Sequence, residues 1–266
     1  MRLVTTIYLT LAMLVGCAGV SWGADAQKNS STQVPIDHEE PIYHEKYYPE
    51  GTGPFPAVIA LHTSGGFKTV AHVIQNYVDD GFVVYAPDFF RRHGLTSKTR
   101  MKTFTTYRAS IEQELSIIVS LMKLDKKINE NNIFAVGFSN GGFWVSYLAG
   151  TSKVRAGASH YGVWKANFGR EFTNPYPMKY FSRSSSPILA LHGIQDGTQL
   201  LEWAERALAE IRQRGGRTEN HFYRDAGHAW DRKNPPKRAW KYNEKVTKDS
   251  HRRTIDFFET QMRTSN

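Results

Sequence analysis

The strongest constraint on the fold is the alternation of short apolar segments with amphipathic segments along residues 56–262. The apolar segments have the length of strands, whereas the amphipathic segments carry apolar residues three or four positions apart, which places them on one face of a helix. Strands that alternate with helices form a mostly parallel sheet covered by helices on both faces. The predicted strands are 56–61, 82–86, 133–136, 154–159, 188–191 and 218–223, and the predicted helices cover about 70–78, 107–122, 140–149, 200–211 and a C-terminal segment ending near 262.

The preceding segment adds an edge to this sheet. Residues 33–50 carry Ile36, Ile42 and Tyr43 between turn-forming residues, which predicts an antiparallel hairpin. The chain has 266 residues, of which 40% are hydrophobic and 13% aromatic, so it can bury a large core and is not disordered or collagen-like. We therefore expect a single α/β domain over residues 27–266.

Residues 1–26 resemble an export signal rather than part of the fold. Arg2 precedes an uncharged, mostly apolar run, and Ala24-Asp25-Ala26 provides a small-x-small cleavage site. Cys17, the only cysteine, ends a Leu-Val-Gly-Cys sequence that resembles a bacterial lipobox, in which the cysteine is acylated. A membrane-spanning anchor is a third interpretation. We expect the mature chain to be extracytoplasmic, periplasmic or secreted, with a lipid at Cys17 as its candidate membrane contact.

The formal net charge of +9 is concentrated near the C-terminus, where residues 232–253 hold nine basic side chains against Glu244 and Asp249. Such a segment can bind a polyanion or form the solvated face of a helix. Helical spacing of three apolar residues that follow favours the solvated face, and no motif predicts nucleic-acid binding. The basic residues are Arg232, Lys233, Lys237, Arg238, Lys241, Lys245, Lys248, Arg252 and Arg253, and the apolar ones are Ile255, Phe258 and Met262.

The segment after the strand at 133–136 carries the clearest chemical signal. Gly137, Ser139 and Gly141 form a Gly-x-Ser-x-Gly pattern between a predicted strand and a predicted helix. A turn this tight strains the central residue and leaves room only for glycines beside it, so the serine hydroxyl is exposed at the helix start. The positive end of the helix dipole favours negative charge developing there. Ser139 is thus a candidate nucleophile, with a helix N-cap serine as the alternative.

A serine nucleophile needs a histidine to accept its proton and an acid to orient that histidine. Asp196 follows the predicted strand at 188–191, and His228 follows the one at 218–223. The carboxyl ends of parallel strands meet at one sheet edge, so both are expected near Ser139. The alternatives are a turn or helix-capping role for Asp196 and an ordinary loop position for His228. Other histidines, namely His160, His192 and His221, are interpreted as structural.

The Gly137–Gly142 segment and the loops with Asp196 and His228 resemble those of the dienelactone hydrolase family of α/β hydrolases. The Val58-Ile59-Ala60, Asp80-Gly81-Phe82 and Ala86-Pro87-Asp88 segments fit the same pattern, so the resemblance covers roughly residues 55–262. It implies an α/β-hydrolase fold. It also implies an oxyanion hole built from the backbone N–H groups of Asn140 and Thr63, or of Ser64 if the loop is shifted by one residue.

The chain departs from this family at positions that bear on the substrate. The family's typical enzyme has a cysteine where this chain has Ser139 and a glutamate where it has His62, which argues against lactone specificity. Arg92 matches an arginine that binds a substrate carboxylate in the family, although a solvated loop arginine is equally compatible. Trp230, two residues after His228, is a second candidate substrate contact.

A long aromatic connection provides a candidate pocket wall. Residues 163–186 form a connection that is longer than a typical loop, and long loops on compact domains often carry function. We expect this segment to line an apolar acyl or aryl pocket. Its aromatic residues are Trp164, Phe168, Phe172, Tyr176, Tyr180 and Phe181.

These observations together predict an exported serine hydrolase that cleaves carboxylic esters of small molecules through a Ser139-His228-Asp196 triad. A serine peptidase or thioesterase would use the same three residues, and a non-catalytic exported binding protein on this fold is the remaining alternative. No cofactor or catalytic metal is expected, because no phosphate-binding glycine loop or metal-ligand motif is present. The single cysteine and the absence of a zinc-ligand spacing also predict neither a disulfide nor a structural metal.

Overall fold

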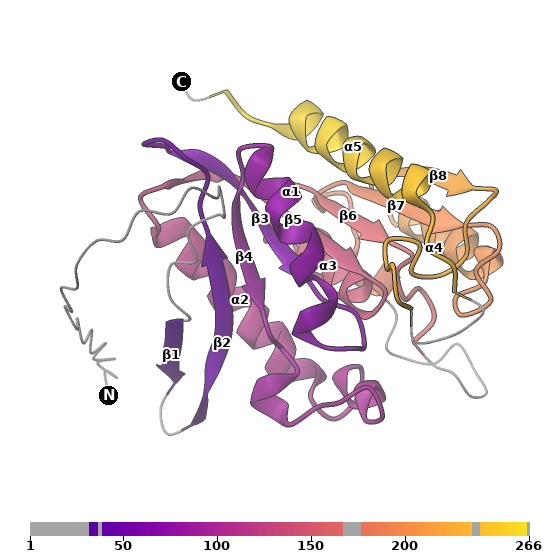
Figure 1. The fold of residues 1–266 in the computed structure, drawn as a ribbon, viewed down its shortest axis with the longest axis horizontal. Coiled ribbons are helices and arrows are strands. Elements are labelled where there is room, and N and C mark those ends of the chain that lie inside the picture. Colours follow the sequence, from indigo (N-terminus) through magenta and orange to yellow (C-terminus); the bar gives the residue numbers. More distant parts are fainter. Residues whose placement is uncertain (1–31, 37–38, 167–176, 236–239, 265–266) are drawn as a thin grey trace.

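The computed structural model describes residues 32–36, 39–166, 177–235 and 240–264, which form an eight-stranded sheet. The strand order is β1-β2-β4-β3-β5-β6-β7-β8, with β3 to β8 parallel and the β1–β2 hairpin antiparallel at one edge (Figure 1). The predicted sheet and edge hairpin are confirmed. The strands are β1 (Thr32–Ile36), β2 (Glu39–Tyr47), β3 (Phe55–Leu61), β4 (Val83–Pro87), β5 (Ile128–Phe138), β6 (Gly157–His160), β7 (Ile188–Gly193) and β8 (Thr218–Tyr223).

Among the described residues, five α-helices cover the sheet, and short 3₁₀ turns occupy several connections. Each of these α-helices lies where the spacing of apolar residues predicted a helix. The helices are α1 (Ala71–Asp79), α2 (Arg108–Leu124), α3 (Asn140–Gly150), α4 (Leu201–Gln213) and α5 (Glu244–Gln261). The 3₁₀ turns are η1 (Phe67–Thr69), η2 (Arg91–His93), η3 (Arg100–Thr103) and η4 (Pro177–Tyr180).

Two apolar cores lie on opposite faces of the sheet because successive strand residues point to opposite sides. In β3, Ala57, Ile59 and Leu61 pack in the core beneath α2, α3 and α4, whereas Val58 and Ala60 pack in the core beneath α1 and α5. Figure 1 shows α1 and α5 crossing the near face of the sheet. This two-sided burial explains why the central strands read as continuous apolar runs.

The first and last residues of β5 and β6 differ from the sequence prediction. β5 begins at Ile128 rather than at residue 133, because Ile128 already pairs with Phe55 of β3; after a register shift the pairing continues from Ile133 and Ala57. β6 begins at Gly157, three residues later than predicted. At their carboxyl ends, which position the site, β5 and β6 extend by two residues and one residue beyond the predicted strands.

In the part of the chain that the structure describes, the basic C-terminal segment is helical only from Glu244 onward, and three of its basic residues on that helix are paired with carboxylates there. On α5, Lys248 pairs with Glu244, and Arg252 and Arg253 both pair with Asp249. Its other side is apolar: Phe258 is fully buried, and Ile255 and Met262 are partly buried against the same core. This agrees with the solvated-face interpretation. The predicted signal segment, residues 1–26, lies outside the described residues, among which no helix has the length and apolarity to cross a membrane.

A buried histidine at the hairpin makes stability depend on pH. His44 on β2 is 2% exposed and stacks on Tyr85, and burial together with the charge of Lys46 lowers the pKa of His44 to about 4. In the unfolded chain its pKa is near 6.5, so between pH 6.5 and 4 the unfolded state binds more protons and folding weakens as the pH falls.

We therefore predict that wild type loses about 2 kcal/mol more unfolding free energy than His44→Phe between pH 7 and pH 5. Phenylalanine keeps the stacked ring and removes the titrating group. Urea unfolding at both pH values measures this difference. Between pH 7 and 8.5 the unfolding free energies of the two proteins should change with pH in the same way. Parallel behaviour down to pH 5 would show that His44 takes up its proton equally well when buried.

Candidate functional site

Ser139 occupies a sharp turn between β5 and α3 that only glycines on either side permit. Its backbone has φ 52° and ψ −109°, a region that residues with side chains rarely adopt. A Cβ on Gly137 would lie 2.3 Å from the Gly141 carbonyl oxygen, and a Cβ on Gly141 would lie 2.2 Å from the Leu61 carbonyl oxygen. The turn therefore presses the start of α3 against the end of β3.

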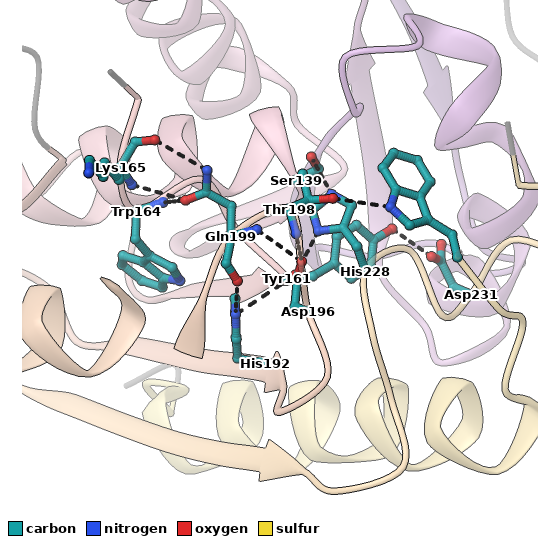
Figure 2. Close-up of polar contacts among 11 residues, drawn as sticks. Ser139, Tyr161, Trp164, Lys165, His192, Asp196, Thr198, Gln199, His228 and Asp231 are labelled. Carbon is teal, nitrogen blue, oxygen red and sulfur yellow. Dashed lines mark hydrogen bonds and ion pairs between the residues drawn. The ribbon is translucent and has the colours of Figure 1, made fainter. Parts of the chain in front are cut away.

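Three side chains from three strand ends meet at this turn. The His228 Nε2 atom lies 2.9 Å from the Ser139 Oγ, and the His228 Nδ1 atom lies 2.7 Å from an Asp196 carboxylate oxygen (Figure 2). All three residues are at most 8% exposed. The hydroxyl can thus pass its proton to an imidazole whose other nitrogen is held by a carboxylate.

Asp196 is held in place as an anion. Its second carboxylate oxygen accepts the backbone N–H groups of Thr198 and Gln199 at 2.7 and 2.9 Å. Burial alone would raise the pKa of Asp196, but the hydrogen bond and charge of His228 outweigh burial, so the pKa lies below its usual value. His192, which the sequence analysis interprets as structural, lies with its Nε2 atom 2.8 Å from the Gln199 carbonyl oxygen, and burial lowers the pKa of His192.

The backbone N–H groups that are available as oxyanion donors differ from the pair predicted first, Asn140 and Thr63. The Thr63 N–H donates to the Thr69 hydroxyl at 3.0 Å, so it is already engaged and the Thr63 assignment is corrected. The N–H groups of Ser64 and Asn140 have no acceptor among the residues that the structure describes. Ser64 lines the cavity that contains Ser139, and Asn140 directly follows Ser139 in the chain. The alternative with the loop shifted by one residue, Ser64, is the one compatible with this geometry.

His62 fixes the loop after β3, which carries the Ser64 N–H group. It is fully buried, stacks on Phe89 with ring centroids 3.8 Å apart, and contacts the Thr63 carbonyl through Nδ1 at 2.7 Å. Burial lowers the pKa of His62 to about 4, so the ring is neutral at neutral pH and Nδ1 donates its proton to that carbonyl. The neutral His62 ring therefore cannot supply the negative charge of the glutamate that the family's typical enzyme has at this position.

Two aromatic residues that sequence reasoning missed flank the His228 imidazole. The Tyr161 ring lies 4.9 Å from the His228 ring, and its hydroxyl donates to buried Asp231 at 2.5 Å. Trp240 lies 4.8 Å from the same imidazole and donates through Nε1 to the Thr198 hydroxyl. Tyr161 could have been found because it directly follows a strand end, whereas nothing in the sequence around Trp240 marks it.

The two candidate substrate contacts lie elsewhere. Trp230 is fully buried, packs against Tyr161 and Tyr223, and donates to the Ser250 hydroxyl, so it belongs to the core beneath α5. Arg92 is not among the residues lining the cavity; its charge acts on the buried Glu114 carboxylate. Both assignments are corrected, because adjacency in sequence to the site does not determine which way a side chain points.

The predicted pocket wall is only partly described. Val163 lines the cavity, but Trp164 and Phe181 are buried in the core and Tyr180 packs on Tyr147 of α3. Residues 167–176, including Phe168, Phe172 and Tyr176, lie outside the described residues. Met101 and Phe104, at and just after η3, supply further apolar lining of the cavity.

Comparison with known proteins agrees with this architecture. A model of the dienelactone hydrolase family matches residues 45–262. The chain belongs to the dienelactone hydrolase family. A protein of Escherichia coli (strain K12) assigned as a carboxymethylenebutenolidase is 23% identical over 245 residues, which is 88% of each chain.

Two solved structures of this family share the fold. A Klebsiella pneumoniae subsp. pneumoniae MGH 78578 protein assigned as a dienelactone hydrolase is 20% identical, with a TM-score of 0.73 over 86% of this chain and 97% of that one. A dienelactone hydrolase-like promiscuous phosphotriesterase from metagenomic libraries is 18% identical, with a TM-score of 0.72 over 89% and 98%. This dienelactone hydrolase family member therefore has an α/β-hydrolase fold.

The glycine contacts predict a steep cost for one added methyl group. Gly141→Ala should lose about 1–3 kcal/mol of unfolding free energy, because α3 must move away from the Leu61 carbonyl. Gly197→Ala is the matched control, since its added Cβ meets nothing within 4 Å. Urea unfolding midpoints measure both. Equal midpoints would contradict the close approach of α3 to β3.

Proposed function

We propose that this protein is a serine hydrolase that cleaves carboxylic esters through an acyl-enzyme on Ser139. The observation that carries the proposal is the His228 imidazole, which lies within hydrogen-bond distance of the Ser139 hydroxyl and the Asp196 carboxylate at once. Membership of a hydrolase family supports the same chemistry.

The proposed mechanism is acyl transfer to water. His228 accepts the Ser139 proton as the hydroxyl attacks the ester carbonyl, and Asp196 stabilises the imidazolium that forms. The oxyanion of the tetrahedral intermediate accepts hydrogen bonds from the N–H groups of Asn140 and Ser64. His228 then protonates the leaving alcohol and activates the water that releases the acid. Of the groups that these steps use, Ser139, His228 and Ser64 line the same cavity.

The cavity supports a small ester with an apolar body and a negative charge. It has a volume of about 540 Å³ and is lined by apolar Met101, Phe104, Val163 and Trp240. Lys98, Arg100 and Arg232 also line it, and clustered cations favour an anionic substrate. The E. coli relative is named for a carboxymethylenebutenolide. For this chain we propose open-chain esters rather than a lactone, because Ser139 and neutral His62 replace the cysteine and the glutamate.

A fluorophosphonate probe tests the nucleophile. Wild type should be labelled on Ser139, whereas Ser139→Ala should not be labelled and should lose about a million-fold in kcat on chromogenic esters. Peptide mass spectrometry of the labelled protein identifies the modified residue. Undiminished labelling of Ser139→Ala would overturn the proposal, and faster turnover of thioesters or aminoacyl amides than of matched esters would favour the thioesterase or peptidase alternative. A protein with neither label nor turnover would favour the binding-protein alternative.

The oxyanion loop provides a second test. Thr69 accepts the Thr63 N–H and donates to the Gly66 carbonyl, so Thr69→Val should loosen the loop and lower kcat about tenfold with little change in KM. Thr69→Ser keeps both bonds and should retain activity. Thr254→Val is the control, because it removes a buried hydroxyl in α5 that also donates to a backbone carbonyl. An equal loss in the control would mean that the effect is one of stability.

We further propose that the protein acts outside the cytoplasm, on the strength of the signal-like sequence of residues 1–26. The full chain expressed in a bacterial host should yield a mature protein that begins at Gln27, or at an acylated Cys17 if the lipobox is used. Intact mass measurement separates these products. Recovery of the uncleaved chain from the cytoplasm alone would refute the proposal.

A further inference from the structure

A second cleft lies at the opposite edge of the sheet from Ser139. It has a volume of about 380 Å³ and is lined by residues near the start of β5 and by the loops that lead into β6, β7 and β8. Ser139 follows the carboxyl end of β5, whereas Glu130 and Asn131 of this cleft lie near the amino end of the same strand. The two sites therefore face opposite poles of the domain.

The side chains around this cleft are strongly unbalanced in charge. Five basic residues line it against one carboxylate, that of Glu130, and no ion pair involves any of the six among the described residues. They come from five separate places along the chain, so no run of charge in the sequence marks them. The six are Lys123, Glu130, Lys153, Arg155, Arg217 and Arg263.

The basic residues are close enough to repel one another. Burial and the charges of Arg263 and Arg217 lower the pKa of Arg155. The contrast with α5 is sharp, because Lys248 and Arg252 there each have a carboxylate partner within 3 Å. Five like charges near a single carboxylate destabilise the folded state, and a bound anion relieves that cost.

Neighbouring hydrogen bonds hold the cleft in shape. The Arg155 Nε donates to the Gln261 carbonyl at 2.6 Å, which fixes the guanidinium. The Asn132 amide bonds both the N–H and the carbonyl of Arg263, at 2.8 and 3.0 Å. On the far side, the Ser186 hydroxyl donates to the Val154 carbonyl at 2.6 Å. The Arg155 guanidinium is therefore pre-ordered and loses little entropy when it binds an anion.

We propose that this basic cleft binds a phosphate-bearing anion. Arginine presents a planar fork of N–H donors that matches phosphate oxygens, and the three arginines are supplemented by two lysines and by serine hydroxyls. The phosphate can belong to a soluble molecule or to a phospholipid headgroup. The site is separate from the catalytic residues, so its occupancy does not depend on the ester hydrolase proposal.

Arg217→Gln/Arg263→Gln tests the site with little risk to folding, because both residues are exposed. Lys248→Gln/Arg252→Gln is the matched control: it also removes two exposed cations, but from α5, where they are paired. Pyrophosphate binding is measured by calorimetry, and sedimentation with phosphatidylglycerol vesicles, against phosphatidylcholine vesicles, measures headgroup binding. Thermal melting verifies that all variants are folded.

Wild type should bind pyrophosphate at low ionic strength, more weakly as salt is added, and the Arg217/Arg263 variant should bind about tenfold more weakly or worse. The α5 control should bind like wild type. Additional binding to phosphatidylglycerol vesicles that follows the same order of variants would identify a headgroup as the phosphate source, whereas pyrophosphate binding alone would identify a soluble one. Absence of binding in wild type, or equal losses in both variants, would overturn the proposal.

Discussion

The close approach of α3 to the end of β3 is the contact on which the rest of the site depends. Gly137 and Gly141 leave no space for a side chain, since an added Cβ on either would lie within 2.4 Å of backbone atoms. This contact drives Ser139 into a positive φ and presents its hydroxyl at the start of a helix. It also brings the Asn140 N–H beside the loop that follows β3, so the nucleophile and both proposed oxyanion donors are set by one backbone feature.

The parallel sheet then delivers the other two members of the triad. β5, β6, β7 and β8 are consecutive neighbours, so the loops after β5, β7 and β8 lie along one edge. Asp196 and His228 need only short loops to reach Ser139. For this reason the fold and the triad positions could be predicted from the sequence: apolar runs give the strands, and parallel order brings the residues after them to one edge.

What the sequence could not supply depends on side-chain direction and on contacts between distant segments. The Thr63 N–H is engaged by a threonine six residues away, and no sequence pattern distinguishes that from an open donor. Trp230 and Trp240 are both near His228 in the chain, yet only Trp240 lines the cavity. The basic cleft likewise brings together residues that are far apart in the chain, from Lys123 to Arg263. In the basic segment that is apparent from the sequence, by contrast, Arg252 and Arg253 are paired within α5.

We propose that the three side chains and two backbone N–H groups form one reaction centre. A crystal structure of the protein after reaction with a fluorophosphonate tests this most directly. We expect phosphorus bonded to the Ser139 Oγ, with the phosphonyl oxygen about 2.7–3.1 Å from the N–H groups of Asn140 and Ser64 and with His228 still bonded to Asp196. A phosphonyl oxygen turned away from both donors, or an adduct on another residue, would contradict it.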